Sequence, residues 1–126
     1  MINILLMQAF TQIVSGLGLT FTKSQTINGY TNSYTKYTLN GEYIKSEDVF
    51  DTFYDLDLVI ILSQNQIEVT FSTSYYSHIS VTMLGELDTN SKSISWFVDR
   101  EYGLSDSNEA VDYEIVAKIK SLTNSL

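Results

Sequence analysis

The sequence contains no cysteine, no proline and a single histidine in 126 residues. Without cysteine the chain cannot form a disulfide, a thiol nucleophile, or a zinc or iron–sulfur site built on thiolates. His78 is the only histidine, so it is the only imidazole base that a catalytic triad could use, and no Gly-x-Ser-x-Gly motif is present to hold a serine nucleophile. We therefore expect His78 to be structural and the protein not to be an enzyme.

Long hydrophobic runs are also missing. The longest apolar run near the N-terminus, Ile4–Met7, is too short for the core of a signal peptide, and no basic segment precedes it. No stretch approaches the ~20 apolar residues that cross a bilayer as a helix. We expect a cytoplasmic protein that does not bind membranes.

Charge is scarce and unevenly spread. Charged residues make up 17% of the chain, below the roughly 25% that is typical of globular domains. Residues 1–45 carry three lysines and one glutamate, a net charge of +2, whereas residues 46–126 carry fourteen acids and four bases, a net charge of −10. This acidity disfavours direct binding to nucleic acid and favours a basic protein partner. It is also consistent with a charge that only maintains solubility.

The length and the 44% hydrophobic content predict one domain, spanning residues 1–126, with a core of its own. Leu6, Phe10, Ile13 and Leu17 recur at spacings of three and four, which predicts a helix over 2–15, with Gly16 and Gly18 ending it. A second helix is expected over 108–123. Its apolar stripe consists of Val111, Ile115, Ile119 and Leu122.

Two Asn-Gly pairs predict turns. Asn40-Gly41 lies between two short apolar runs and predicts a type I′ hairpin. Asn28-Gly29 predicts a second hairpin, with a bulge or a three-residue loop that sets Phe21 opposite Tyr37. Ser46-Glu47-Asp48 is typical of a helix start, so a short middle helix is expected through Phe53 to Leu56.

The remaining pattern is that of strands. The run 58–62 is apolar on both faces, which predicts a central strand, and alternating strands are expected over 67–71, 79–87 and 94–98. A turn is expected over 88–91. Together these elements predict an α+β fold: a mostly antiparallel sheet of about five to seven strands, with an N-terminal, a short middle and a C-terminal helix packed on one face.

Carboxylates and tyrosines are the candidate binding residues. Asp51 and Asp55 lie four positions apart and would share a helix face, but their spacing does not match a calcium loop, and we expect a solvated acidic edge with no metal or cofactor. Tyr43 and one of Tyr75 and Tyr76 should point outward by strand parity. The predicted partner-binding residues are Tyr43, Glu47, Asp48, Asp51, Asp55, Asp57, Tyr75, Tyr76, Asp99 and Glu101.

Three functions remain open, in this order. The first is a non-enzymatic acidic protein-binding module that blocks a basic nuclease or nucleic-acid-binding complex, a composition typical of small inhibitor and immunity proteins of bacteria and phages. The second is a structural or assembly subunit that forms a homodimer or larger homo-oligomer through the sheet edge or the uncharged first helix. The third is a ligand-binding domain with a cavity lined by Phe50, Phe53, Trp96 and Phe97.

Overall fold

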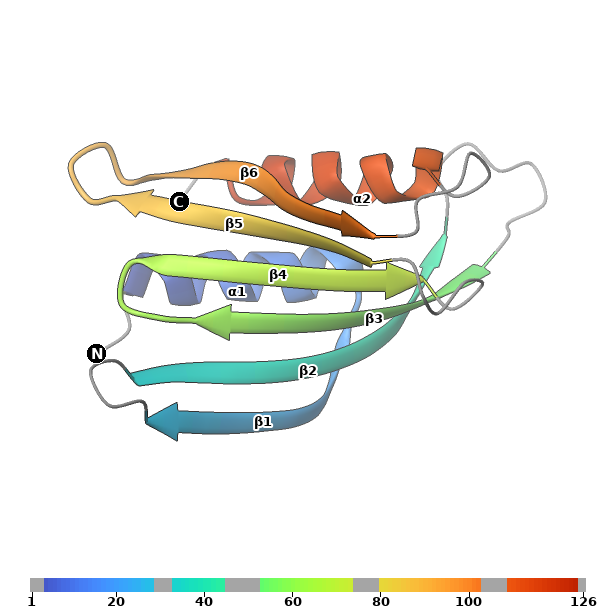
Figure 1. Ribbon diagram of the computed structural model, residues 1–126, viewed down its shortest axis with the longest axis horizontal. Helices are drawn as coiled ribbons and strands as arrows, with labels where there is room; N and C mark the ends of the chain where they lie inside the picture. The colour runs from blue at the N-terminus through green and yellow to red at the C-terminus, as the bar shows by residue number, and fades with distance from the viewer. Residues whose placement is uncertain (1–3, 29–32, 45–52, 74–79, 103–108, 125–126) are drawn as a thin grey trace.

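The computed structural model describes residues 4–28, 33–44, 53–73, 80–102 and 109–124. They form a small α+β domain with one antiparallel sheet and two helices (Figure 1). The elements, in chain order, are α1 (Ile4–Leu17), β1 (Thr20–Asn28), β2 (Ser33–Ile44), β3 (Phe53–Leu62), β4 (Gln66–Thr73), β5 (Ser80–Asp88), β6 (Ser93–Tyr102) and α2 (Glu109–Leu122).

The six strands follow one another across the sheet in sequence order, β1-β2-β3-β4-β5-β6, and each pairs antiparallel with its neighbour. Both helices lie on the same side of this sheet, α1 behind its middle strands and α2 beside β6 (Figure 1). Six strands are described against the five to seven expected, and two helices against the three expected. Neither helix among the described residues is long and apolar enough to cross a membrane.

The core fills the space between the helices and one face of the sheet. Alternate residues of each strand point to it because strand side chains have a period of two. The side chains of α1 that enter it recur at helical spacing, as the sequence predicts. The fully or nearly buried apolar residues are Leu6, Ala9, Phe10, Ile13, Leu17, Leu19, Leu39, Leu56, Leu58, Ile60, Leu62, Ile67, Val69, Phe71, Val81, Met83, Ile115, Val116 and Ile119.

Helix α1 ends where its glycines predict. Gly18 has a φ of 68°, the left-handed conformation that a side chain disfavours. The backbone N–H of Gly18 donates to Ser15 O at 3.3 Å, and that of Leu19 donates to Val14 O at 3.0 Å. This pair of bonds is a Schellman motif, which satisfies carbonyls that the helix itself leaves unpaired.

The predicted hairpin at Asn40-Gly41 is wrong. Strand β2 runs through both residues, which pair with Asp57 and Leu56 of β3. A type I′ turn requires positive φ at both central residues, and neither residue has it. The glycine instead serves packing, because a Cβ at position 41 would collide with the side chain of Leu19.

The predicted middle helix is wrong over the residues that the structure describes. Phe53 to Leu56 belong to β3, where they pair with Ile44 to Gly41 of β2. The rest of that prediction, residues 46–52, lies outside the described residues. Long pairing with β2 outweighs the weak local preference of a four-residue segment, because tertiary contacts override helix propensity.

The predicted pairing of β1 with β2 is correct in its partners and wrong in its register. Phe21 lies opposite Leu39, not Tyr37, and the register shifts between Phe21 and Lys23. Thr22 is therefore the extra residue of a β-bulge. Strand β6, at the other edge, also has a bulge: Thr82 pairs with Arg100 and Met83 with Val98, so Asp99 is the extra residue. Both edges of the sheet are thus irregular.

Candidate functional site

The two faces of the sheet differ in what covers them. The face that holds the core is here called the covered face, and the opposite one the open face. Neither described helix lies over the open face, and the side chains described on it are exposed or half-buried except for Thr82. The described residues of the open face include Lys36, Thr38, Asn40, Asp57, Val59, Ile61, Glu68, Thr70, Thr82, Leu84, Glu86 and Phe97.

One row of the open face crosses five strands. Its residues are paired in register from β2 to β6, in the order Lys36, Ile61, Glu68, Leu84 and Phe97. Phe97, at the edge of the sheet, is 44% exposed, which is high for a large apolar side chain. The row therefore alternates charged and apolar side chains from β2 to β5 and ends in a second apolar side chain on β6.

The adjacent row is mostly hydroxylic between its two ends, where Lys23 of β1 pairs with Thr38 and Arg100 of β6 pairs with Thr82. Thr38, Val59, Thr70 and Thr82 occupy it in register. The hydroxyls of Thr70 and Thr82 share a hydrogen bond of 3.0 Å, and Thr82 is only 4% exposed. Cross-strand threonine pairs stabilise the pairing of their strands. This row therefore adds stability to the sheet beside the charged row.

Among the side chains described on the open face, three of the four ionisable ones are acidic. Asp57 is exposed on β3, and its Oδ1 accepts a hydrogen bond of 2.9 Å from Asn40 Nδ2 on β2. Glu86 is exposed on β5, and Glu68 is half-buried on β4. Lys36 is the one basic side chain that the structure describes on this face.

Of the predicted partner-binding residues, Asp57 alone has a described side chain, and it lies on the open face. Four others lie in strands: Tyr43 pairs with Tyr54, Asp55 with Glu42 and Glu101 with Val81, whereas Asp99 is the bulge residue of β6. Glu47, Asp48, Asp51, Tyr75 and Tyr76 lie outside the described residues. Since Asp55 is in a strand, the helix face that it was expected to share with Asp51 is not formed.

No sequence pattern assigned Val59, Ile61, Leu84 or Phe97 to a surface. Phe97 was expected to line a cavity together with Trp96, but the two residues are adjacent in β6 and so face opposite sides of the sheet. The alternation Ile94, Trp96, Val98 already contained this signal, because it assigns Phe97 to the other face. The run 58–62, which is apolar on both faces of its strand, was a second signal that apolar residues lie on the open face.

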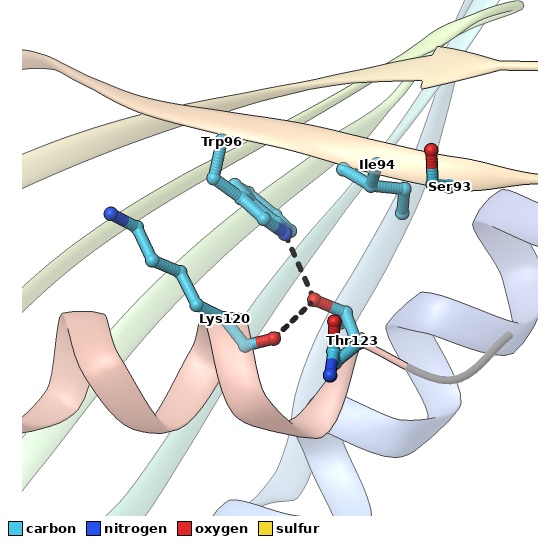
Figure 2. Close-up of a pocket in the computed structure, with 6 residues that line it drawn as sticks. Ser93, Ile94, Trp96, Lys120 and Thr123 are labelled. Atoms are coloured by element: carbon cyan, nitrogen blue, oxygen red, sulfur yellow. Dashed lines mark hydrogen bonds between the residues drawn. The ribbon is translucent and has the colours of Figure 1, made fainter.

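A small pocket lies on the covered side, between β6 and the end of α2 (Figure 2). Its volume is about 210 Å³, and Ile94, Trp96, Lys120 and Thr123 are among the residues that line it. The indole Nε1 of Trp96 donates to Thr123 Oγ1 at 2.9 Å, and that hydroxyl donates to Ile119 O at 2.9 Å (the bond to Trp96 is drawn in Figure 2). Ligand sites usually exceed ~300 Å³, so this pocket gives the ligand-cavity alternative no support.

The titratable groups that the structure describes form no further site. Within the described part of the chain, no group of three or more His, Cys, Asp or Glu side chains could hold a metal ion. The pKa of Asp88 is lowered, mainly because its carboxylate accepts hydrogen bonds from the backbone N–H groups of Asn90 and Ser91. This contact holds the β5–β6 turn, where Lys92 has a φ of 55°, and the turn agrees with the prediction over 88–91.

No protein-family model, curated protein or solved structure was found to match this chain. Its function is therefore inferred from its own residues.

Proposed function

We propose that this protein is a non-enzymatic acidic binding module of inhibitor or immunity type, which blocks a basic nuclease or nucleic-acid-binding protein by charge complementarity. The observation that carries the proposal is the charge of the open face. Its described ionisable side chains are three carboxylates, Asp57, Glu68 and Glu86, and one lysine, Lys36. The net charge of −8 has the same sign. A protein surface that binds phosphates is rich in Lys and Arg, and it is complementary to such a set of carboxylates.

Charge of this kind acts first on the rate of association. An acidic surface raises the local concentration of a basic partner and speeds encounter, an effect that falls as salt rises. Shorter-range contacts then determine how long the complex lasts, since most differences in affinity between related complexes lie in the dissociation rate. Binding should therefore have a salt-dependent part and a salt-independent part.

The test uses two variants with the same net charge. Asp57→Asn combined with Glu86→Gln removes two charges from the open face, whereas Gln64→Lys combined with Ser121→Lys adds two positive charges at exposed positions elsewhere. The tagged wild-type chain first captures its partner from nuclease-treated host lysate, and the purified partner is then titrated against each variant at low and high salt.

We expect the open-face variant to weaken binding about tenfold and its charge-matched control by about twofold or less, because charge acts most strongly at contact distance. An affinity that is the same for both variants and the wild type, or that does not change with salt, would contradict the proposal.

Self-assembly is a second candidate function, favoured by one observation. Helix α1 contains no charged residue, and Ile4 at its start is 72% exposed beside the half-buried Met7. An uncharged helix surface is where two chains of charge −8 would meet with the least repulsion. Light scattering at micromolar concentration decides between the two, since a monomer removes self-assembly.

A further inference from the structure

Strand β3 carries apolar side chains on both faces. Leu58 and Ile60 are fully buried on the covered face, whereas Val59 and Ile61 lie half-buried on the open face. An antiparallel sheet with one solvated face usually alternates apolar and polar residues. The pattern of β3 is instead that of a strand covered on both sides, yet neither described helix lies over Val59 and Ile61.

Further apolar side chains continue this surface across the sheet. Ile61, Leu84 and Phe97 lie in one register row, on β3, β5 and β6. Three strand spacings separate the first from the last, a span of about 14 Å. Three apolar side chains spaced four residues apart on one helix cover about 12 Å along its axis. The row therefore matches the apolar stripe of a short amphipathic helix.

Glu68 lies in the same row, between Ile61 and Leu84. A purely apolar occupant would remove this carboxylate from water at a cost in free energy, whereas a Lys or Arg in the occupant would offset that cost. Asp57 and Glu86, both exposed, add negative charge on the same face. The occupant should therefore be basic around its apolar stripe.

The edges of the sheet favour a helix over an added strand. Each edge strand carries a bulge, at Thr22 in β1 and at Asp99 in β6, and bulges interrupt the regular backbone pairing that strand addition needs. The covered face, moreover, is already closed by helices. A helix on the open face would complete a three-layer arrangement.

We infer that the open face is the docking surface for an amphipathic, basic α-helix of the partner, with apolar side chains on Ile61, Leu84 and Phe97 and a Lys or Arg beside Glu68. This inference rests on the proposed function, because it takes the partner to be basic. A second copy of the chain is a poorer occupant, since each copy has a net charge of −8.

The probe is a synthetic amphipathic peptide of about 18 residues, or five helical turns, with a stripe of leucines flanked by lysines. Backbone amide NMR shifts are recorded during titration. We expect the largest changes on β3 to β6 around Val59, Ile61, Leu84 and Phe97. A peptide of the same composition in scrambled order, and one with glutamate in place of lysine, should bind about tenfold more weakly or worse, because they lose the stripe or the charge match.

Two aromatic truncations of similar exposure give the matched comparison. Phe97 is 44% exposed on the open face, and Tyr113 is 48% exposed on α2. Phe97→Ala should weaken peptide binding about tenfold, as expected for an anchor residue, and Tyr113→Ala by about twofold or less. Glu68→Gln should weaken binding of the lysine peptide while leaving the fold intact, since Glu68 is only half-buried.

Several results would overturn the inference. Shift changes confined to α1, α2 or the 88–92 turn would place the peptide elsewhere, and equal affinity for Phe97→Ala and the wild type would remove the anchor. A wild-type dimer that Phe97→Ala converts to a monomer would show that a second copy of the chain occupies the open face.

If the captured natural partner still binds in a salt-dependent way to Phe97→Ala with unchanged affinity, helix docking fails and the basic-partner function stands. A natural complex that ignores salt would instead refute the proposed function.

Discussion

The covered and open faces of the sheet are built from the same six strands but from different side chains. The covered face collects Leu, Ile, Val, Met and Phe against α1 and α2, and most of these side chains are fully buried. The open face mixes threonine, Val59, Ile61, Leu84 and Phe97 with carboxylates, and most of its side chains keep some contact with solvent. Stability therefore depends mainly on one face, which leaves the other free to change for binding.

Neighbouring isoleucines of β3 give the most direct test of this division. Ile60 is fully buried on the covered face and Ile61 is half-buried on the open face. We expect Ile60→Ala to lower the free energy of unfolding by about 2–5 kcal/mol, because it removes buried methyl groups and leaves a cavity. Ile61→Ala should cost about 1 kcal/mol. Urea denaturation of both variants measures the difference.

The same pair also separates stability from binding. Ile61→Ala should weaken binding of the basic amphipathic peptide by several-fold, while the less stable Ile60→Ala, studied well below its unfolding midpoint, should bind normally. If the two isoleucines proved equally costly to stability, the open face would be as much a part of the core as the covered one.

A smaller effect is expected at the contact between β6 and α2. Thr123, 3% exposed, accepts a hydrogen bond of 2.9 Å from Trp96 Nε1, and its own hydroxyl donates a hydrogen bond to Ile119 O. Thr123→Val should lower the free energy of unfolding by about 1–3 kcal/mol, because the indole N–H loses its acceptor. Trp96→Phe should lower the free energy of unfolding by less in the Thr123→Val background than in the wild type, because the shared hydrogen bond is already absent there. Strict additivity in thermal unfolding would show that the bond contributes nothing.

The smallest effect is expected in the turn that joins β5 to β6, which belongs to neither face. Asp88 is fully exposed, and the backbone N–H groups of Asn90 and Ser91 lower its pKa below the ordinary value of 3.8. A carboxyl whose pKa is lower in the folded state stabilises the fold above that ordinary value, and loses this contribution as the pH falls through the folded pKa. The stability gap between wild type and Asp88→Ala should therefore be constant near neutral pH and shrink below pH 3.8. A gap that grew towards acid pH would reverse the sign of this argument.

Much of the fold could be predicted because local signals agreed with the packing. The three- and four-residue spacing of Leu6, Phe10 and Ile13 and the glycine at position 18 place α1 and its end, and the alternation in β4 and β5 assigns their buried faces. The hairpin predicted at Asn40-Gly41 was wrong because the pair prefers a turn in isolation, whereas ten residue pairs between β2 and β3 hold it extended. The helix predicted through Phe53 to Leu56 was wrong for the same reason, since these residues pair with β2.

The candidate site was only partly predictable. Asp57 was identified from the density of carboxylates, but that count did not distinguish it from acids in other settings. The row of Ile61, Glu68, Leu84 and Phe97 depends on the registers of three strand pairs, and a single-sequence pattern gives the face of each residue but not its cross-strand neighbour. The cavity alternative grouped Phe97 with Trp96, although adjacent residues of a strand face opposite sides of the sheet.

The order of the elements along the chain has a consequence for synthesis. Helix α1 leaves the ribosome before the strands that bury Leu6, Phe10 and Ile13, and the apolar residues of β3 extend to Leu62. At ordinary elongation rates of about 5–20 residues per second, the helix waits roughly two to nine seconds for them. Throughout that interval it is an apolar segment without a single charged side chain. Within this domain the nascent chain is therefore most exposed to aggregation and to chaperone binding at α1, before the sheet that covers it exists.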